Sequence, residues 1–287
     1  MGNNEKKVKV ARLSIFSNTI LIIMKVIVGI LSGSVSILSE AIHSGLDLVA
    51  AVISYISVKL SGIPADKDHP YGHGKYENVS GVIEALLIFV AAIWIMYEAS
   101  KKIMHREKIE ALGWGFAIMM ISALINFFIS RRLYKVARET DSIALEADAL
   151  HLKTDVFTSA GVSIGLLLIA ITGKTILDPI IAILVAIFII RESYILLRNA
   201  YNPLLDASLP ENEIETIRTI LNSNKICYHN LRTRKSGSQK FVDLHVEMPE
   251  LTPLKEVHEK CDEIEALLKA EISNAEVNIH METPGSI

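Results

Sequence analysis

The sequence has few cysteines and lacks the motifs of two common kinds of zinc site. Its 287 residues include two cysteines, Cys227 and Cys261, which form no Cys-x-x-Cys motif. Two isolated thiols argue against a disulfide framework and against a thiolate zinc cluster. The His-Glu-x-x-His motif of a membrane zinc protease is also absent. An excess of one charge is missing too, since the net charge is -3, and the composition gives no reason to expect a nucleic-acid partner.

Long hydrophobic runs are what the sequence does have. Hydrophobic residues make up 51% of the chain and the mean hydropathy is +0.37, values typical of membrane proteins. Apolar blocks with short polar breaks fill the sequence to about residue 200, and charged, alternating patterns follow Pro203. We therefore predict a membrane domain over residues 1–203 and a soluble domain over residues 204–287.

Six segments are long and apolar enough to cross a bilayer as helices, which takes about 20 residues. These segments are approximately 12–32, 35–59, 79–99, 112–130, 146–172 and 177–197. Lys and Arg predominate in the loops on the side of the N-terminus, so the positive-inside rule places that side in the cytosol; the basic segment Lys101–Lys108 is an exception. We expect a multi-pass protein of the cell membrane, with both termini and the soluble domain in the cytoplasm.

Two of the predicted spans carry a histidine and an aspartate four residues apart. His43 and Asp47 lie in the second span, and His151 and Asp155 lie in the fifth. Residues i and i+4 share a helix face, so two adjacent helices would present two imidazoles and two carboxylates at similar depth. This ligand set suits tetrahedral Zn²⁺, and it also admits Co²⁺, Fe²⁺, Cd²⁺ or Mn²⁺.

Hydrogen bonds between helices are the alternative explanation for any one of these residues. Two His/Asp pairs in separate spans favour a metal site, because a charged group at this depth is costly unless it is paired or functional. The other polar residues of the spans are isolated, and they suit snorkelling, packing or support of the ligands. They are Lys25, Glu84, Asn126, Asp148 and Lys153.

The loop between the second and third spans offers further ligands. Its Pro and Gly residues predict a tight, irregular loop. Two histidines and one carboxylate would make a second metal site here, and a solvated polar loop is the alternative. The candidate ligands are Asp66, Asp68, His69, His73 and Glu77.

The soluble part has the pattern of a small α+β domain. From about residue 208, segments typical of helix, strand, strand, helix and strand follow one another, with a Gly turn between the first two strands. An open sheet with both helices on one face fits this order. Four histidines lie here, and ordinary surface residues are the alternative to metal ligands. They are His229, His245, His258 and His280, with Glu282 two residues after the last.

Taken together, these motifs resemble the cation diffusion facilitator family, and most closely its bacterial zinc/proton antiporters. The segments that carry the resemblance are GSVSILSEAIHSGLD (33–47), DKDHPYGHGKYE (66–77), EADALHLKTDVFTSAGV (146–162), DPIIAILVA (178–186), LLDASLP (204–210) and LRTRKSG (231–237). The resemblance implies a six-helix bundle in the lipid bilayer, a cytosolic metallochaperone-like domain and a homodimer. It implies a transporter rather than an enzyme, with divalent metal ions and protons as partners and no organic cofactor.

The resemblance also assigns roles to residues. The family's transport site maps to His43, Asp47, His151 and Asp155, and a histidine at the first of these positions resembles the more zinc-selective members. The family's loop site maps to Asp66, His69 and His73. Its C-terminal metal site maps to His229, His245, His258 and His280, with Glu282 where close relatives carry Asp. A charge interlock between the membrane helices and the soluble domain maps to Lys75 and Asp206.

The resulting expectation is zinc export by proton-coupled antiport. Metal binds deprotonated ligands, so binding releases protons, and a free histidine titrates within the physiological range. A site that faces the two sides in turn would load zinc inside and lose it to protons outside. Zinc bound by the soluble domain would regulate transport. The alternatives are an Fe(II), Mn(II) or Cd exporter of the same family, and a membrane metal sensor that does not transport.

Overall fold

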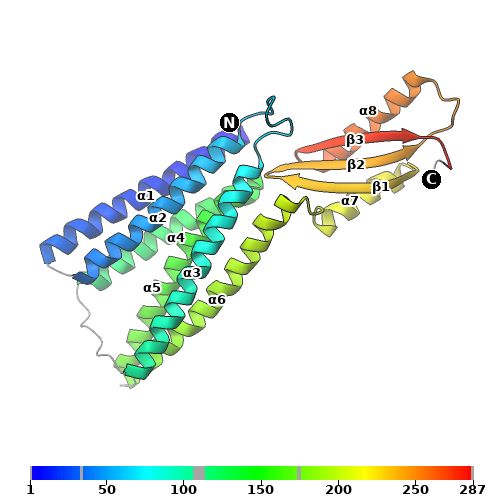
Figure 1. Cartoon of the computed structure of the whole chain (residues 1–287). Helices are drawn as coiled ribbons and strands as arrows, with labels where there is room; N and C mark the ends of the chain where they lie inside the picture. Colours follow the sequence, from blue (N-terminus) through cyan, green and yellow to red (C-terminus); the bar gives the residue numbers. More distant parts are fainter. Residues whose placement is uncertain (1, 33–34, 106–113, 173–175, 286–287) are drawn as a thin grey trace. The chain divides into compact units, whose positions relative to one another are not determined.

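The computed structural model describes residues 2–32, 35–105, 114–172 and 176–285 (Figure 1). The chain divides into two compact units, Met1–Tyr201 and Asn202–Ile287. The first unit is helical, and the second combines two helices with a three-stranded sheet. This architecture confirms the predicted fold class, a helical membrane bundle followed by a small α+β domain.

The first unit consists of long helices that exceed the thickness of a bilayer. They contain 25 to 31 residues, so at 1.5 Å per residue the longest spans about 46 Å, against roughly 30 Å of hydrocarbon. Their polar ends therefore extend beyond the predicted spans, as in the fourth helix, which continues through its basic end to Thr140. The helices are α1 (Asn3–Ser32), α2 (Val35–Ser61), α3 (Lys75–His105), α4 (Trp114–Thr140), α5 (Ile143–Thr172) and α6 (Leu177–Tyr201).

Five of the described helices contain a stretch long and apolar enough to cross a membrane. These stretches are Asn3–Leu31, Ala41–Ser61, Lys75–Met104, Ala117–Thr140 and Pro179–Leu205. Outward-facing apolar side chains such as Phe16, Leu124 and Leu184 are exposed, as expected of helices that face lipid. Within the described residues α5 is not among them; the charged residues that it carries, Glu146, Asp148, Lys153 and Asp155, lie in its first half.

The position of α5 explains why it tolerates those charges. Leu145 and Leu152 pack in a buried cluster with residues of α1, α2 and α4, whereas Ala147 and Leu150 pack in another with residues of α3 and α6. Opposite faces of this helix are therefore covered by protein rather than by lipid. Ionisable residues in a membrane helix normally face such a protein interior.

The second unit has the predicted order of helices and strands. After a short 3-10 helix (Asn202–Leu205), it contains α7 (Glu211–Ser223), β1 (Tyr228–Ser236), β2 (Gln239–Glu247), α8 (Leu254–Glu271) and β3 (Ala275–Glu282). The strand order is β1-β2-β3, with β1 antiparallel and β3 parallel to β2. Parallel strands require a crossover connection, which α8 supplies.

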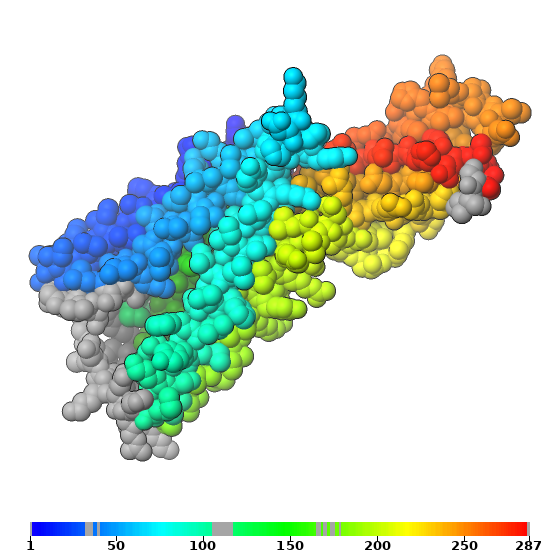
Figure 2. All heavy atoms as spheres, viewed as in Figure 1, coloured from blue at the N-terminus to red at the C-terminus, as the bar shows by residue number. Residues whose placement is uncertain are grey.

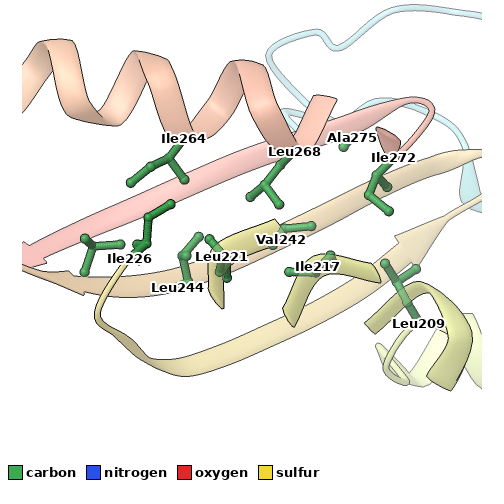
Figure 3. Close-up of a cluster of buried hydrophobic side chains, with 11 residues drawn as sticks. Leu209, Ile217, Leu221, Ile226, Val242, Leu244, Ile264, Leu268, Ile272 and Ala275 are labelled. Atoms are coloured by element: carbon green, nitrogen blue, oxygen red, sulfur yellow. The ribbon is translucent and has the colours of Figure 1, made fainter. Parts of the chain in front are cut away.

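Both helices of this unit cover the same face of the sheet (Figure 3). Leu221 of α7 and Leu268 of α8 share one buried core with Val242 and Leu244 of β2. Because side chains alternate along a strand, Asp243, His245 and Glu247 point to the opposite face, which α7 and α8 leave open. This open face therefore carries polar residues of β2.

Candidate metal sites

The helical unit brings the two His/Asp pairs together between α2 and α5. Ligand atoms of His43, Asp47 and Asp155 all lie within 4.8 Å of one another. His151 joins them through Asp47, since its Nε2 lies 2.9 Å from Asp47 Oδ1. We call these four residues the helix cluster. They are the four that the sequence indicated as a metal site, and their role as ligands remains a prediction.

The helix cluster is only partly shielded. Asp47 is buried, His151 and Asp155 are half-buried, and His43 is exposed. The Nδ1 atom of His151 is buried and has no hydrogen-bond partner among the described residues. Four groups of this kind can bind a cation, or they can hold protons that a cation would displace.

Two further polar residues lie beside the helix cluster, and support of the ligands was one of the three roles that sequence analysis considered for them. Asn126 of α4 donates a hydrogen bond of 3.3 Å from Nδ2 to Asp155 Oδ2. Lys25 of α1 donates one of 2.7 Å from Nζ to Oγ of Ser44, the residue after His43. Each lies in a different span from the His/Asp pairs, so no spacing in the sequence links it to them.

A second group of ligands forms in the loop between α2 and α3, which is largely exposed and drawn in cyan in Figure 2. Ligand atoms of Asp66, His69 and His73 lie within 4.8 Å of one another. We call these residues the loop cluster. The carboxyl of Asp66 lies 3.6 Å from His69 Nδ1 and 3.5 Å from His73 Nε2. Asp66, rather than Asp68 or Glu77, is thus the carboxylate that meets both histidines.

The backbone of the loop holds Asp66 in place. Its Oδ1 accepts hydrogen bonds from the backbone N–H of His69 at 2.7 Å and of Asp68 at 3.0 Å. The bond from His69 contributes most to lowering the pKa of the Asp66 carboxyl, which keeps it ionised. Gly72 has φ +77°, a left-handed conformation that suits glycine and lets the loop turn back between the two histidines.

Glu77 serves a different purpose from the one considered for it. It is buried, and Oε1 accepts hydrogen bonds of 2.8 Å from both Lys7 Nζ and Ser61 Oγ, while Oε2 accepts one from Ser142 Oγ. These contacts join α3 to α1, α2 and the segment before α5. The paired carboxylate therefore fastens one end of the helical unit.

A third group of ligands lies on the open face of the sheet. Strand register places His229 opposite His245, and His245 opposite His280, so the three histidines form a row across the sheet. Glu282 lies at its centre, 2.8 Å from His245 Nδ1, 3.1 Å from His229 Nε2 and 3.4 Å from His280 Nε2. We call these four residues the sheet cluster.

Glu247 adds a carboxylate that sequence analysis missed. Its Oε1 lies 3.3 Å from His229 Nδ1. It follows His245 by two residues, just as Glu282 follows His280, and residues two apart share a face of a strand. That spacing was the available signal for Glu247.

His258 does not join the sheet cluster within the described chain. It lies on α8, which covers the opposite face of the sheet, and it is 75% exposed, with Nε2 3.6 Å from Asp262. The proposed interlock residues lie in different units. Lys75 begins α3, whereas Asp206 lies in the second unit, 3.6 Å from Arg234 Nη1. That interlock remains a prediction.

Comparisons with known proteins match both units. The family model of the cation efflux transmembrane domain matches residues 11–205, and that of the cation efflux protein cytoplasmic domain matches residues 209–284. The uncharacterized transporter sll1263 of Synechocystis sp. is 34% identical over 255 residues, which are 88% of this chain and 82% of that protein. The cation-efflux pump FieF of Yersinia enterocolitica is 31% identical over 266 residues, or 92% and 88%.

One solved structure is similar to part of the chain. It is that of a candidate zinc transporter, CzrB, in a zinc form, which is 32% identical and covers 28% of this chain and 94% of its own. Its TM-score of 0.27 is too low to bear on the fold.

Proposed function

The chain belongs to the cation efflux family and exports divalent metal cations across a membrane, and we propose that zinc is its main cargo and protons its counter-ion. The helix cluster is the transport site in this proposal. Two imidazoles and two carboxylates suit a tetrahedral zinc ion. His43 supports zinc over the harder Fe(II) and Mn(II), because a second imidazole makes the site less suited to harder cations, and a tetrahedral ligand set is less suited to the larger Cd, which accepts more ligands.

One contact supports proton coupling more than any other. His151 Nε2 and Asp47 Oδ1 lie 2.9 Å apart, the distance of an ordinary hydrogen bond, in which one proton lies between them. A zinc ion that takes both atoms as ligands must displace that proton. Metal binding would therefore release a proton on one side of the membrane, and protonation would expel the metal on the other.

Export requires the helix cluster to face the two sides of the membrane in turn. We propose that both termini and the second unit lie in the cytoplasm, that zinc enters from there, and that rearrangement of the bundle exposes the cluster to the far side. The chain would act as a homodimer. The sheet and loop clusters would bind cytoplasmic zinc and regulate transport, with His258 of one protomer available to the sheet cluster of the other.

A reconstituted system tests the proposal directly. Purified protein in vesicles with a pH gradient should move zinc, and zinc movement should move protons in the opposite direction, as read with zinc- and pH-sensitive dyes. Competition of Fe²⁺, Mn²⁺ and Cd²⁺ with zinc in this assay ranks the cations by how well they are transported. Zinc flux that does not depend on the pH gradient would contradict proton coupling. Binding of zinc without any flux would favour the metal-sensor alternative.

A further inference from the structure

A buried carboxyl of α3 belongs to none of the three clusters. Glu84 is 0% exposed, and neither of its carboxyl oxygens has a hydrogen-bond partner among the described residues. Ile88, one turn further along the helix, lies in a buried apolar cluster with Ala147 of α5 and Ile189 of α6. Glu84 is therefore a polar side chain enclosed in the interior of the helical unit, where an ionisable group is costly and usually functional.

The helix face that carries Glu84 packs closely against α5 and α6. Gly81 lies three residues before Glu84, so the two share this face. A Cβ atom added at Gly81 would lie 3.0 Å from the Cβ of Ala200 in α6 and 3.3 Å from Cγ1 of Ile143 in α5. Glu84 thus lies on the face where three helices meet, rather than on a face toward lipid.

A second buried carboxyl, that of Asp148 in α5, acts electrostatically on Glu84. Asp148 is 1% exposed, its Oδ1 accepts a hydrogen bond of 3.1 Å from Ser14 Oγ of α1, and its Oδ2 has no partner in the described part of the chain. The imidazole of His151, one turn further along α5, acts on Asp148 in turn. Glu84 is therefore exposed to a charge of its own sign and to the electrostatics of the helix that carries two of the proposed metal ligands.

These surroundings favour a proton on Glu84. An ionised carboxylate without a partner is far more costly to bury than the neutral acid, and two carboxylates in one apolar interior also repel each other. Asp148 has a hydrogen-bond donor, Ser14, to stabilise its charge, whereas Glu84 has none among the described residues. Of these two carboxyl groups, Glu84 is the one that holds the proton.

We infer that Glu84 is a proton-binding residue of the transporter, separate from the metal ligands, which holds a proton while α3, α5 and α6 are closed around it and releases it to water when they part. The inference rests on the proposed function, because it adds a proton-binding group to a proton-coupled exporter. The bundle has to rearrange for the helix cluster to face both sides of the membrane. A rearrangement that admits water to Glu84 hydrates its carboxylate and so removes the reason for keeping the proton.

The experiment measures the number of protons moved per zinc ion by the full-length protein in vesicles, with zinc- and pH-sensitive dyes. Glu84→Gln keeps the shape of the neutral acid but has no proton to release. We expect the ratio of protons to zinc to fall by about one, since a carboxyl binds a single proton, with zinc binding retained. Glu98→Gln is the matched control, because it removes a half-buried carboxyl from the same helix, and it should leave the ratio unchanged. Glu84→Asp keeps a titratable group and should stay near the wild-type ratio.

The outcomes separate the inference from the function on which it rests. An unchanged ratio in Glu84→Gln would overturn the inference and leave the exporter intact, since Glu84 would then never release its proton. If Glu84→Gln binds zinc but does not transport it, flux in Glu84→Asp supports the inference, and loss of flux in both variants contradicts it. Zinc transport by the wild type without proton movement would overturn the proposed coupling. Glu84→Met, checked by size exclusion, replaces Glu84→Gln if that variant does not fold, and the same fall in the ratio is expected.

Discussion

The helix cluster and the sheet cluster use the same side-chain chemistry in different surroundings. In both, imidazole and carboxylate atoms from separate elements lie within 4.8 Å of one another. In the helix cluster, Asp47 is buried, the amide of Asn126 donates to Asp155, and the ammonium of Lys25 donates to Ser44 beside His43. In the sheet cluster, Glu282 touches three histidines on a face that α7 and α8 leave open.

This difference indicates what each cluster can do. A charge buried in the bundle must be balanced by a proton, a cation or a fixed neighbour, which is why we propose that metal binding at the helix cluster is tied to proton movement. Charges near the open sheet face are screened by water and salt. We therefore propose that the sheet cluster takes up metal as the metal concentration changes, which suits regulation rather than transport.

The largest expected effect separates the two clusters by function. Asp47→Asn or Asp155→Asn should reduce zinc flux in vesicles to the background rate, because each removes a charged ligand candidate while preserving shape. The protein should still fold, as judged by size exclusion. His245→Ala with His280→Ala in the same assay serves as the comparison and should retain flux at saturating zinc. A normal rate in either aspartate variant would show that transport uses other residues.

The second effect concerns metal affinity of the sheet cluster. His245→Ala combined with His280→Ala should weaken zinc binding outside the membrane pathway by about tenfold or more, since two imidazole ligand candidates are lost. Zinc-dependent activation of flux should fall in parallel. Calorimetry on the full chain in an Asp47→Asn, Asp66→Ala background separates this binding from that at the helix and loop clusters. An unchanged affinity for zinc would show that the sheet cluster is not the binding site. Complete loss of flux would contradict a purely regulatory role.

The third effect concerns metal selectivity and tests His43, the exposed ligand candidate of the helix cluster. His43→Asp should broaden selectivity toward Cd²⁺ or Mn²⁺, because a carboxylate is a harder ligand and accepts more coordination numbers. The measurement is the ratio of flux rates for zinc and each competitor. We expect the ratio to shift by about tenfold. His229→Asp, in the sheet cluster, is the control and should leave the ratio unchanged.

Sequence periodicity predicted the parts of these clusters that lie on one element. The spacing of His43 and Asp47 placed both on one face of α2, since a helix fixes that geometry locally. Strands were predicted too, but the position of Glu282 among three histidines depends on register between β2 and β3. Lys25 and Asn126 depend on how α1 and α4 pack, which no local pattern encodes. Helix ends were underestimated because hydropathy detects only the hydrocarbon-spanning part.

The smallest expected effect concerns the loop cluster, where backbone N–H groups hold Asp66, a proposed metal ligand. The folded loop lowers the pKa of Asp66, chiefly through the N–H of His69 and then through that of Asp68. A carboxyl whose pKa is lowered by folding stabilises the folded loop at every pH above its ordinary pKa, about 3.9. This contribution is lost as the pH falls through the lowered pKa. The loop should therefore keep its conformation throughout the neutral range.

Hydrogen exchange of the backbone amides of Asp68 and His69 measures this directly. In the wild type, protection should decline only in acid, well below the range in which transport operates. Asp66→Ala should lose protection at neutral pH by a few-fold, because both N–H groups lose their acceptor. Asp68→Ala removes a neighbouring carboxyl that the loop cluster does not use, and it should leave the protection of His69 intact. If the loop opened near neutral pH in the wild type, the backbone hydrogen bonds to Asp66 would be too weak to hold the proposed metal site in place before metal binds.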